Sequence, residues 1–305
     1  MLELLSPSLT VRFSTLGARP VAVLFDGIDA VRCGGTDADI MAGDWTAGAV
    51  CGRFAGRITK ARFALDGVEH KLVPNFGEHQ LHGGPDNFGV RHWKAERQGD
   101  TIRFSISSPD GDQGFPGAVD ATAKYALRGN VLSLDIEART TKPTVINMTS
   151  HAYWNLSDNG NAFDHEMQID GDAYLPLSEE LLPSGEIRKV EGTRWDFRKL
   201  RKVAEPYDNC WALDGKRGEM KRGLVLCDPA SGRRMEVWTT ECGMQMYTAL
   251  HWNETMPGKG GPLRQYQAIA IEPQNFPDAP THANFPSAVL RQGEAYRNRI
   301  EWRFS

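Results

Sequence analysis

The chain reads Leu132-Ser133-Leu134-Asp135-Ile136-Glu137 near its middle, with apolar and polar side chains alternating at every step. The same alternation returns in Ile102-Arg103-Phe104-Ser105-Ile106 and in Ile300-Glu301-Trp302-Arg303-Phe304. Because successive side chains of a β-strand point to opposite faces, each run predicts a strand with one buried face and one solvated face. Strands of this kind are typical of antiparallel sheets rather than of parallel sheets covered by helices.

Turn residues separate the alternating runs, as in Leu65-Asp66-Gly67, Arg128-Gly129-Asn130 and Asp214-Gly215. The 305 residues include 31 glycines and 17 prolines, and they show no long stripe of period 3.6, so we expect few and short helices. No linker, repeat or charge block divides the chain, and all-β sandwiches can exceed 200 residues as one domain. We therefore predict an all-β protein, a single large β-sandwich domain of antiparallel sheets spanning residues 1–305.

Composition and charge exclude several classes of protein. Apolar residues make up 40% of the chain, which is neither a disordered nor a membrane composition. Lysine and arginine number 35 against 39 aspartates and glutamates, and this weak acidity argues against nucleic acid or a membrane as the main partner. The start of the chain lacks the basic region and long apolar core of a secretory signal. We therefore expect a cytoplasmic protein.

The chain predicts neither a metal nor a cofactor. His79 and His82 share an H-x-x-H spacing inside a glycine-rich segment, but this pair alone falls short of the ligand sets that metals usually require. An odd number of cysteines without C-x-x-C spacing predicts unpaired, buried thiols in a reducing compartment. The five cysteines are Cys33, Cys51, Cys210, Cys227 and Cys242.

One carboxylate stands at the end of an apolar run. Ala268-Ile269-Ala270-Ile271 predicts a buried strand, and Glu272 follows it directly, ahead of the proline-rich segment Pro273-Gln274-Asn275-Phe276-Pro277. Burial disfavours the charged form of a carboxylate and raises its pKa toward useful basicity. Because proline cannot continue a central strand, we expect the backbone to turn away after Glu272 and expose a site. Glu272 is therefore a candidate general base, the alternative being a surface ion pair.

Two glycine-containing segments carry cationic or imidazole groups. In Gly52-Arg53-Phe54-Ala55-Gly56-Arg57-Ile58, two arginines four residues apart either present guanidinium groups to an oxygen-rich ligand or are solvated surface cations. In Asn75-Phe76-Gly77-Glu78-His79-Gln80-Leu81-His82-Gly83-Gly84, the paired glycines permit a tight backbone. Such a turn either aims His82 into a cleft or leaves it as a loop histidine with no task.

Two aromatic segments carry further polar groups. In Asn147-Met148-Thr149-Ser150-His151-Ala152-Tyr153-Trp154-Asn155-Leu156, the aromatic residues exclude water and shift the pKa of His151, unless it is a satisfied core histidine. Aromatic faces beside polar groups also suit the C–H faces of a sugar ring. In Tyr207-Asp208-Asn209-Cys210-Trp211, an acid stands beside an amide at the start of a strand, where an Asx-type turn is the default explanation.

Together and in this order, the segments resemble the signature of the aldose 1-epimerases, the galactose mutarotase family. The resemblance extends over almost the whole chain. Two weaker matches lie between the main ones, at Gly111-Asp112-Gln113-Gly114-Phe115-Pro116-Gly117 and Gly243-Met244-Gln245-Met246-Tyr247-Thr248. The main matches are Gly52 to Ile58, Leu81-His82-Gly83-Gly84, Thr149 to Leu156, Tyr207-Asp208, and Glu272-Pro273-Gln274 with Pro277-Asp278-Ala279.

The resemblance implies a galactose-mutarotase-like β-supersandwich that interconverts the α and β anomers of a free sugar without metal or cofactor. It implies that Glu272 takes the proton from the anomeric O1 hydroxyl and that His151 protonates the ring oxygen, which opens the ring. Rotation about C1–C2 and the reverse proton transfers close the other anomer. It also implies that His82 lies near the ring oxygen, that Arg57 contacts sugar oxygens, and that Asp208 holds hydroxyls away from the anomeric centre.

Gln274 is a further binding contact that the resemblance implies. Four positions depart from the family pattern: Gly56 and Ser150 stand where asparagine is common, His79 replaces the asparagine ahead of Leu-His-Gly-Gly, and Trp154 replaces phenylalanine. We expect these positions to line or support the sugar pocket, and His79 to add a hydrogen-bond donor there. The preferred sugar is therefore left open among galactose, glucose, arabinose and fucose.

Other functions remain open from the sequence. A glycoside hydrolase needs two carboxylates that flank the scissile bond, and Asp208 with Glu272 is the pair to nominate. A hexose-6-phosphate epimerase needs extra cations at the pocket rim, for which Arg53 is the candidate. A non-catalytic sugar-binding or regulatory protein can share the same scaffold. The expected partner is a small monosaccharide, and the protein is expected to be a monomer or a homodimer.

Overall fold

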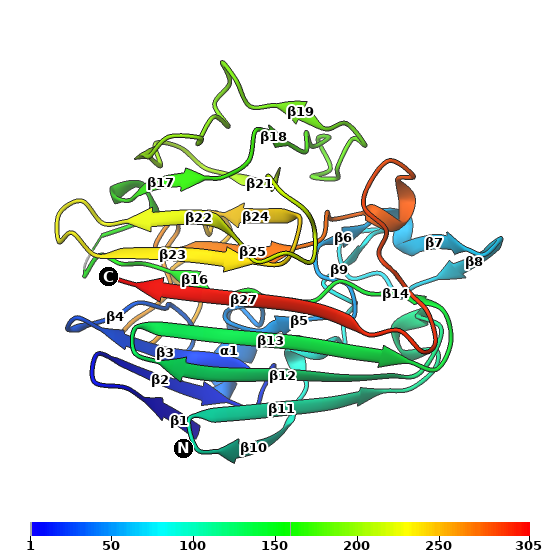
Figure 1. Ribbon diagram of the computed structural model, residues 1–305, viewed down its shortest axis with the longest axis horizontal. Helices are drawn as coiled ribbons and strands as arrows, with labels where there is room; N and C mark the ends of the chain where they lie inside the picture. Colours follow the sequence, from blue (N-terminus) through cyan, green and yellow to red (C-terminus); the bar gives the residue numbers. More distant parts are fainter. Residues whose placement is uncertain (1, 159) are drawn as a thin grey trace.

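The computed structural model describes residues 2–158 and 160–305, which form antiparallel sheets stacked in layers (Figure 1). Every ladder between named strands is antiparallel, as the alternating runs predict. The largest sheet has nine strands, in the order β10 (Lys94–Gln98), β11 (Thr101–Ser108), β12 (Val119–Arg128), β13 (Val131–Thr140), β27 (Tyr296–Phe304), β23 (Arg234–Thr239), β22 (Lys221–Cys227), β17 (Glu166–Ile169) and β20 (Arg201–Lys202).

The remaining sheets are smaller. The second sheet has six strands, in the order β16 (Tyr153–Trp154), β25 (Ile269–Gln274), β24 (Gly243–Tyr247), β21 (Asp208–Ala212), β18 (Ala173–Tyr174) and β19 (Arg188–Lys189). The amino-terminal sheet contains β1 (Leu2–Leu5), β2 (Leu9–Ser14), β3 (Arg19–Phe25) and β4 (Ile28–Asp29). Four two-stranded ladders pair β14 (Thr144–Val145) with β26 (Val289–Leu290), β15 (Thr149–Ser150) with β5 (Val50–Cys51), β6 (Arg57–Ile58) with β9 (Gln80–Leu81), and β7 (Arg62–Leu65) with β8 (Val68–Lys71).

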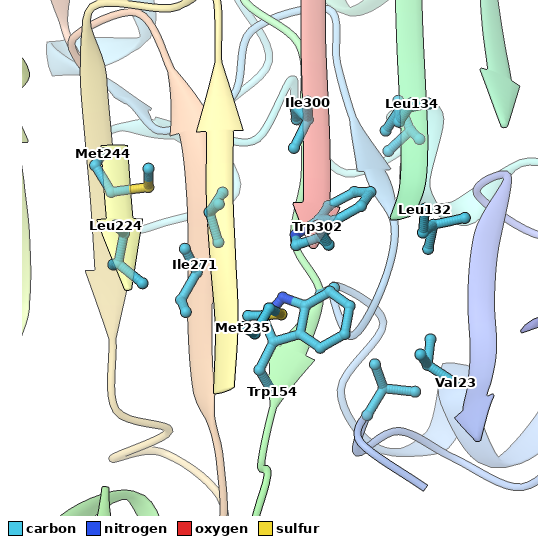
Figure 2. Close-up of a cluster of buried hydrophobic side chains, with 14 of the residues drawn as sticks. Val23, Leu132, Leu134, Trp154, Leu224, Met235, Met244, Ile271, Ile300 and Trp302 are labelled. Carbon is cyan, nitrogen blue, oxygen red and sulfur yellow. The ribbon is translucent and has the colours of Figure 1, made fainter. Parts of the chain in front are cut away.

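The nine-stranded sheet and the six-stranded sheet pack face to face around an apolar core. Trp154 of β16 and Trp302 of β27 are fully buried, and their rings lie 5.5 Å apart between centroids. Figure 2 shows these two indoles between the strands, with Ile271 of β25 and Leu134 of β13 in the same cluster. The alternation read from the sequence is therefore confirmed, because the apolar members of β13 and β27 are the residues that reach this core.

Helices are few and short, as expected. Residues 2–158 and 160–305 contain one α-helix, α1 (Asp37–Ala42). It begins with a capping box in which Thr36 and Asp39 bond each other's backbone N–H groups. The 3₁₀ turns are η1 (Thr59–Ala61), η2 (Phe88–Val90), η3 (Asp112–Gly114), η4 (Ala162–Asp164) and η5 (Ala279–Thr281). Among the described residues, no helix has the length and apolar character needed to cross a membrane.

One expectation about β25 is wrong. The backbone does not turn away after Glu272, because β25 continues through Pro273 to Gln274 and pairs with β24 over its last five residues. In an antiparallel ladder the N and C=O of one residue point to the same side. The carbonyl of Pro273 accepts from Thr149 Oγ1 at 2.7 Å and Asn298 Nδ2 at 2.9 Å, on the side away from β24. The missing proline N–H therefore costs no ladder bond, and Glu272 lies within a rigid strand.

Candidate active site

A cavity of about 500 Å³ opens beside the six-stranded sheet. Strands β21, β24 and β25 each contribute a polar side chain to one wall, and the β6–β9 ladder contributes another wall. In Figure 1, β24 and β25 lie side by side, and β6 and β9 lie close to the end of β25. The lining contains six of the residues that the sequence indicates, namely Arg57, His82, His151, Asp208, Glu272 and Gln274.

Glu272 and His151 meet at the floor of this cavity. Glu272 pairs across the ladder with Gln245 of β24, and His151 lies between the short strands β15 and β16. The side chains are 2% and 5% exposed, and Glu272 Oε1 lies 3.3 Å from His151 Nε2. Glu272 Oε2 and His151 Nδ1 are buried and have no hydrogen-bond partner among the described residues. The pair is thus in direct contact and retains unused donor and acceptor capacity.

Burial shifts both groups of this pair toward their uncharged forms. Burial raises the pKa of Glu272 well above its usual value, and the nearby carboxylate of Asp208 raises it further. Burial lowers the pKa of His151 to about 4, although the carboxylate of Asp44 acts in the opposite direction. The neutral pair and the ion pair contain the same number of protons. One proton can therefore move between the two groups across their contact without exchange with solvent.

His82 is held as a neutral hydrogen-bond donor. Its Nδ1 accepts from the backbone N–H of Gly56 at 3.2 Å, so the ring proton lies on Nε2. Burial lowers the pKa of His82 well below its usual value, and the neighbouring His151 and Arg57 lower it further. The backbone of His82 has φ +51°, and a Cβ on Gly83 would meet the carbonyl oxygen of Gly52 at 2.3 Å. Of the two alternatives left open by the sequence, the structure has the first: the glycine-containing turn places His82 on the cavity wall.

Arg57 and Asp208 form a polar wall of the same cavity. Arg57 Nη2 donates to Asp208 Oδ2 at 3.2 Å, and the guanidinium lies 5.0 Å from the ring centroid of Phe76. Asp208 Oδ1 also accepts from Gln245 Nε2 at 2.6 Å. The side-chain oxygen and nitrogen of Gln274 are buried without hydrogen-bond partners in the part of the chain that the structure describes. These groups can exchange hydrogen bonds with a polyhydroxylated ligand.

Two indicated residues lie outside the cavity. His79 is buried, and its Nδ1 accepts from the backbone N–H of Lys60 at 2.9 Å, so it supports the loop rather than adding a donor to the pocket. Arg53 is also buried, and it donates to Ser108 Oγ at 2.9 Å and to the carbonyl of Gly117 at 2.7 Å. Arg53 therefore cannot supply the rim cation that a phosphosugar would need.

The other departures from the family pattern are distributed unevenly. Gly56 lines the cavity with φ +84°, and a Cβ there would meet Pro277 Cβ at 2.8 Å. Position 56 thus requires glycine for two reasons: its backbone has a positive φ, and a side chain there would collide with Pro277. Ser150 and Trp154 are buried away from the cavity lining, and Trp154 belongs to the core between the sheets. Among the four departures, only Gly56 faces the ligand space.

The site contains one donor set that resembles a metal centre. His82, His151 and Glu272 each offer a ligand atom within 4.8 Å of the others, and two histidines with a glutamate can bind zinc. A ligating histidine normally donates its second ring N–H to an acceptor. His82 does the reverse, because its Nδ1 accepts from Gly56 and its Nε2 carries the proton. The hydrogen-bond arrangement therefore suits a proton donor rather than a metal ligand.

Sequence reasoning missed part of the cavity wall. Asp44 lies in the loop after α1, while Tyr247 and His251 come from β24 and the loop that follows it. Tyr247 lies in the weaker family match Gly243-Met244-Gln245-Met246-Tyr247-Thr248, which by itself indicates no role for this tyrosine. Asp44 stands in Gly43-Asp44-Trp45, where nothing in the local pattern distinguishes it from a surface turn. Its burial results from contacts with residues about two hundred positions away.

The family model described as aldose 1-epimerase matches residues 1–303, so the chain belongs to this family of isomerases. Galactose mutarotase of Bos taurus is 37% identical over 269 residues, which cover 85% of this chain and 78% of the bovine protein. Aldose 1-epimerase of Escherichia coli K12 is 35% identical over 275 residues, which cover 84% of this chain and 79% of that protein.

Solved structures give the same result for the fold. The GalM/aldose epimerase homologue from C. elegans superposes with a TM-score of 0.93 at 28% identity, covering 100% of this chain and 98% of that chain. Galactose 1-epimerase from Lactobacillus acidophilus superposes with a TM-score of 0.88 at 25% identity, covering 99% of this chain and 93% of that chain. The resemblance and the galactose-mutarotase-like fold inferred from the sequence are confirmed.

Proposed function

We propose that this protein is a mutarotase that interconverts the α and β anomers of a free aldose, with Glu272 as the base and His151 as the acid. The observation that carries the proposal is the buried contact of 3.3 Å between these two side chains at the floor of a sugar-sized cavity. The names of the relatives, galactose mutarotase and aldose 1-epimerase, support the reaction class.

The ring-opening step moves two protons. Glu272, as the carboxylate, takes the proton from the O1 hydroxyl, and the O–H electrons form the C1=O bond. The C1–O5 bond breaks, and O5 receives the proton from the His151 imidazolium. Glu272 is then protonated and His151 is neutral. After rotation about C1–C2, His151 takes the proton back from O5, O5 attacks the other face of C1, and Glu272 returns the proton to O1.

The single-proton state of the pair is the active one. Glu272 and His151 together must hold one proton, because the base must be free while the acid is loaded. At low pH both groups are protonated and the base is lost, whereas at high pH neither is protonated and the acid is lost. The rate should therefore follow a bell whose two limbs belong to the pair rather than to either residue.

The surrounding residues are proposed to orient the sugar. The Nε2–H group of His82 would donate to the ring oxygen as negative charge develops there. Arg57 and Asp208 fix each other and would bind hydroxyl groups away from C1. The unpartnered amide of Gln274 would bind a further hydroxyl. A site that bonds hydroxyl groups rejects analogues that lack them.

A panel of freshly dissolved α-anomers of galactose, glucose, arabinose and fucose tests the proposal by polarimetry. We expect accelerated equilibration of at least one sugar and no release of reducing ends from oligosaccharides, which separates this enzyme from a glycoside hydrolase. Sugar binding without acceleration would instead favour the non-catalytic alternative. His151→Asn should bind sugar but fail to accelerate the reaction.

A further inference from the structure

Asp44 is a buried carboxylate on the cavity wall with every oxygen occupied. Its Oδ2 accepts from Trp252 Nε1 at 2.7 Å and lies 3.2 Å from His251 Nε2. Its Oδ1 accepts from the backbone N–H of Thr46 at 2.9 Å and from the Thr46 hydroxyl. A carboxylate with four donors around it is held as an anion and has no free oxygen for a sugar. Asp44 is therefore not a substrate contact, although it lines the cavity.

The loop that carries Asp44 is joined directly to the backbone of His151. The N–H of Gly48 donates to the carbonyl of His151 at 3.0 Å, and the N–H of His151 donates to the carbonyl of Ala49 at 2.8 Å. The buried guanidinium of Arg19 donates to the carbonyls of Trp45 and Ala47 at 3.0 and 2.8 Å. This loop is thus fixed relative to the acid/base pair.

Asp44 also binds the loop that follows β24, through His251 and Trp252. His251 bridges Asp44 and Tyr247, because its Nδ1 lies 2.6 Å from the Tyr247 hydroxyl. The ring of Trp252 packs 4.4 Å from that of Tyr153, between centroids. Tyr153 in turn lies 5.0 Å from the His151 ring. The carboxylate therefore connects the loop after β24, through two aromatic rings, to the proposed acid.

We propose that Asp44 is a positioning residue for the acid/base pair, a fixed anion that keeps the shared proton on His151 and Glu272 near neutral pH. This inference rests on the proposed mutarotase function. The charge acts at a distance through the buried surroundings of the pair, where electrostatic effects are stronger than in water. The same four hydrogen bonds that hold the anion also hold the cavity wall in place.

The electrostatic directions agree with this geometry. Burial opposes ionisation of Asp44, but the hydrogen bonds from His251 and Thr46 and the charges of His251 and His151 outweigh it and place the pKa of Asp44 far below its usual range. Asp44 is the strongest influence that opposes the lowering of the His151 pKa by burial. It also helps to raise the pKa of Glu272.

The other charged groups near His151 shift its pKa in different directions. His251 lowers its pKa further and Asp208 raises it. The pKa of the neighbouring His82 is itself lowered well below its usual value by burial, so His82 adds no full charge beside His151. Asp44 is therefore the strongest of the charged neighbours that favour the protonated imidazole.

Asp44→Asn removes the charge and nearly preserves the shape. We expect both limbs of the pH–rate bell to move down by about one pH unit, so that the rate on the alkaline limb falls about tenfold, mainly in kcat rather than in KM. Trp252→Phe is the matched control, because it removes one hydrogen bond from Asp44 while keeping the charge and an aromatic ring against Tyr153. Its bell should stay at the wild-type position. Asp44→Glu should restore the position of the bell in part.

The design remains decisive if Asp44→Asn does not fold. In the double variant Asp44→Asn/Trp252→Phe the new amide no longer faces the indole N–H, and its bell is compared with that of Trp252→Phe. A bell that stays in place without the charge, or that moves equally in Trp252→Phe, overturns the proposal. A wild-type protein that accelerates no sugar overturns the mutarotase function instead. In that case, NMR titration of the His151 ring, which needs no turnover, still decides whether Asp44→Asn lowers its pKa.

Discussion

The core between the two large sheets and the cavity beside β25 are equally buried, yet their polar groups differ. In the core, Trp154 and Trp302 leave only single neutral indole N–H groups without partners among the described residues. In the cavity, the unpartnered buried atoms include those of a carboxyl group, an imidazole and an amide, on Glu272, His151 and Gln274, besides Arg57 Nε and the Tyr153 hydroxyl. Buried polar groups without partners are costly. The cavity therefore lowers the stability of the fold, and in return its side chains retain hydrogen-bonding groups that a ligand can use.

The largest expected effect separates catalysis from folding. Glu272→Gln keeps the size of the side chain but removes the proposed base, so the mutarotation rate should fall by about 10²–10⁴-fold. Since an amide cannot ionise, the melting temperature should be equal to or higher than that of the wild type at pH 8. Polarimetry and thermal unfolding monitored by circular dichroism provide the two measurements. Full activity in this variant would show that Glu272 is not the base.

The converse change should affect folding and spare catalysis. Trp302→Ala empties a large volume between the sheets, and the free energy of unfolding should fall by about 3–5 kcal/mol. Trp302 does not line the cavity, so kcat measured well below the melting temperature should stay within about twofold of wild type. Chemical denaturation and steady-state rates test both parts. A large loss of kcat in the folded variant would mean that the core and the cavity are not independent.

An intermediate effect is expected at the turn of His82 and Gly83, because the backbone conformation there positions a side chain of the cavity. Gly83→Ala places a methyl group against the carbonyl of Gly52 at φ +95°, so we expect a loss of about 1–3 kcal/mol in unfolding free energy. His82 must shift with this turn, so kcat/KM should fall as well. Gly99→Ala is the matched control, because Gly99 also has a positive φ but has open space around it. Equal loss of kcat/KM in both variants would argue against a special role for the His82 turn.

The smallest effect concerns the pH dependence of stability. The folded-state pKa of His151 is depressed to about 4 from 6.5, so stability should fall as pH decreases through this interval, because the unfolded chain takes up the proton first. The folded-state pKa of Glu272 is raised, so its contribution is lost as pH rises above about 4.5. His151→Asn should flatten the acidic side of the stability profile, and Glu272→Gln should flatten the alkaline side. Unchanged profiles would mean that neither group is perturbed in the fold.

The sequence predicts the sheets well because their signal is local. Alternation in β13 and β27 depends only on neighbouring residues, and the structure buries the expected face of each strand. The path of β25 was mispredicted for a non-local reason: whether Pro273 breaks a ladder depends on which edge its missing N–H would face, and only the pairing with β24 determines that.

The site was only partly predictable for the same reason. Family resemblance located Glu272, His151 and five sugar-binding candidates, and six of these seven residues line the cavity. It did not place His79, whose role depends on a contact with the backbone of Lys60. Asp44 carries no local signal either, because its burial is created by His251 and Trp252. Contacts between distant segments are what the pattern of a single chain leaves out.

The continuation of β25 through Glu272 has a consequence for how the protein can be altered. The proposed base, Glu272, is anchored in a hydrogen-bonded ladder, whereas the cavity mouth carries Leu181 and Leu250, two exposed side chains on connecting segments outside the strands. Loops tolerate sequence change better than the elements that they connect. Selection experiments that randomise these two positions can therefore broaden or narrow the range of accepted sugars, while the proton-transfer machinery stays untouched on its scaffold.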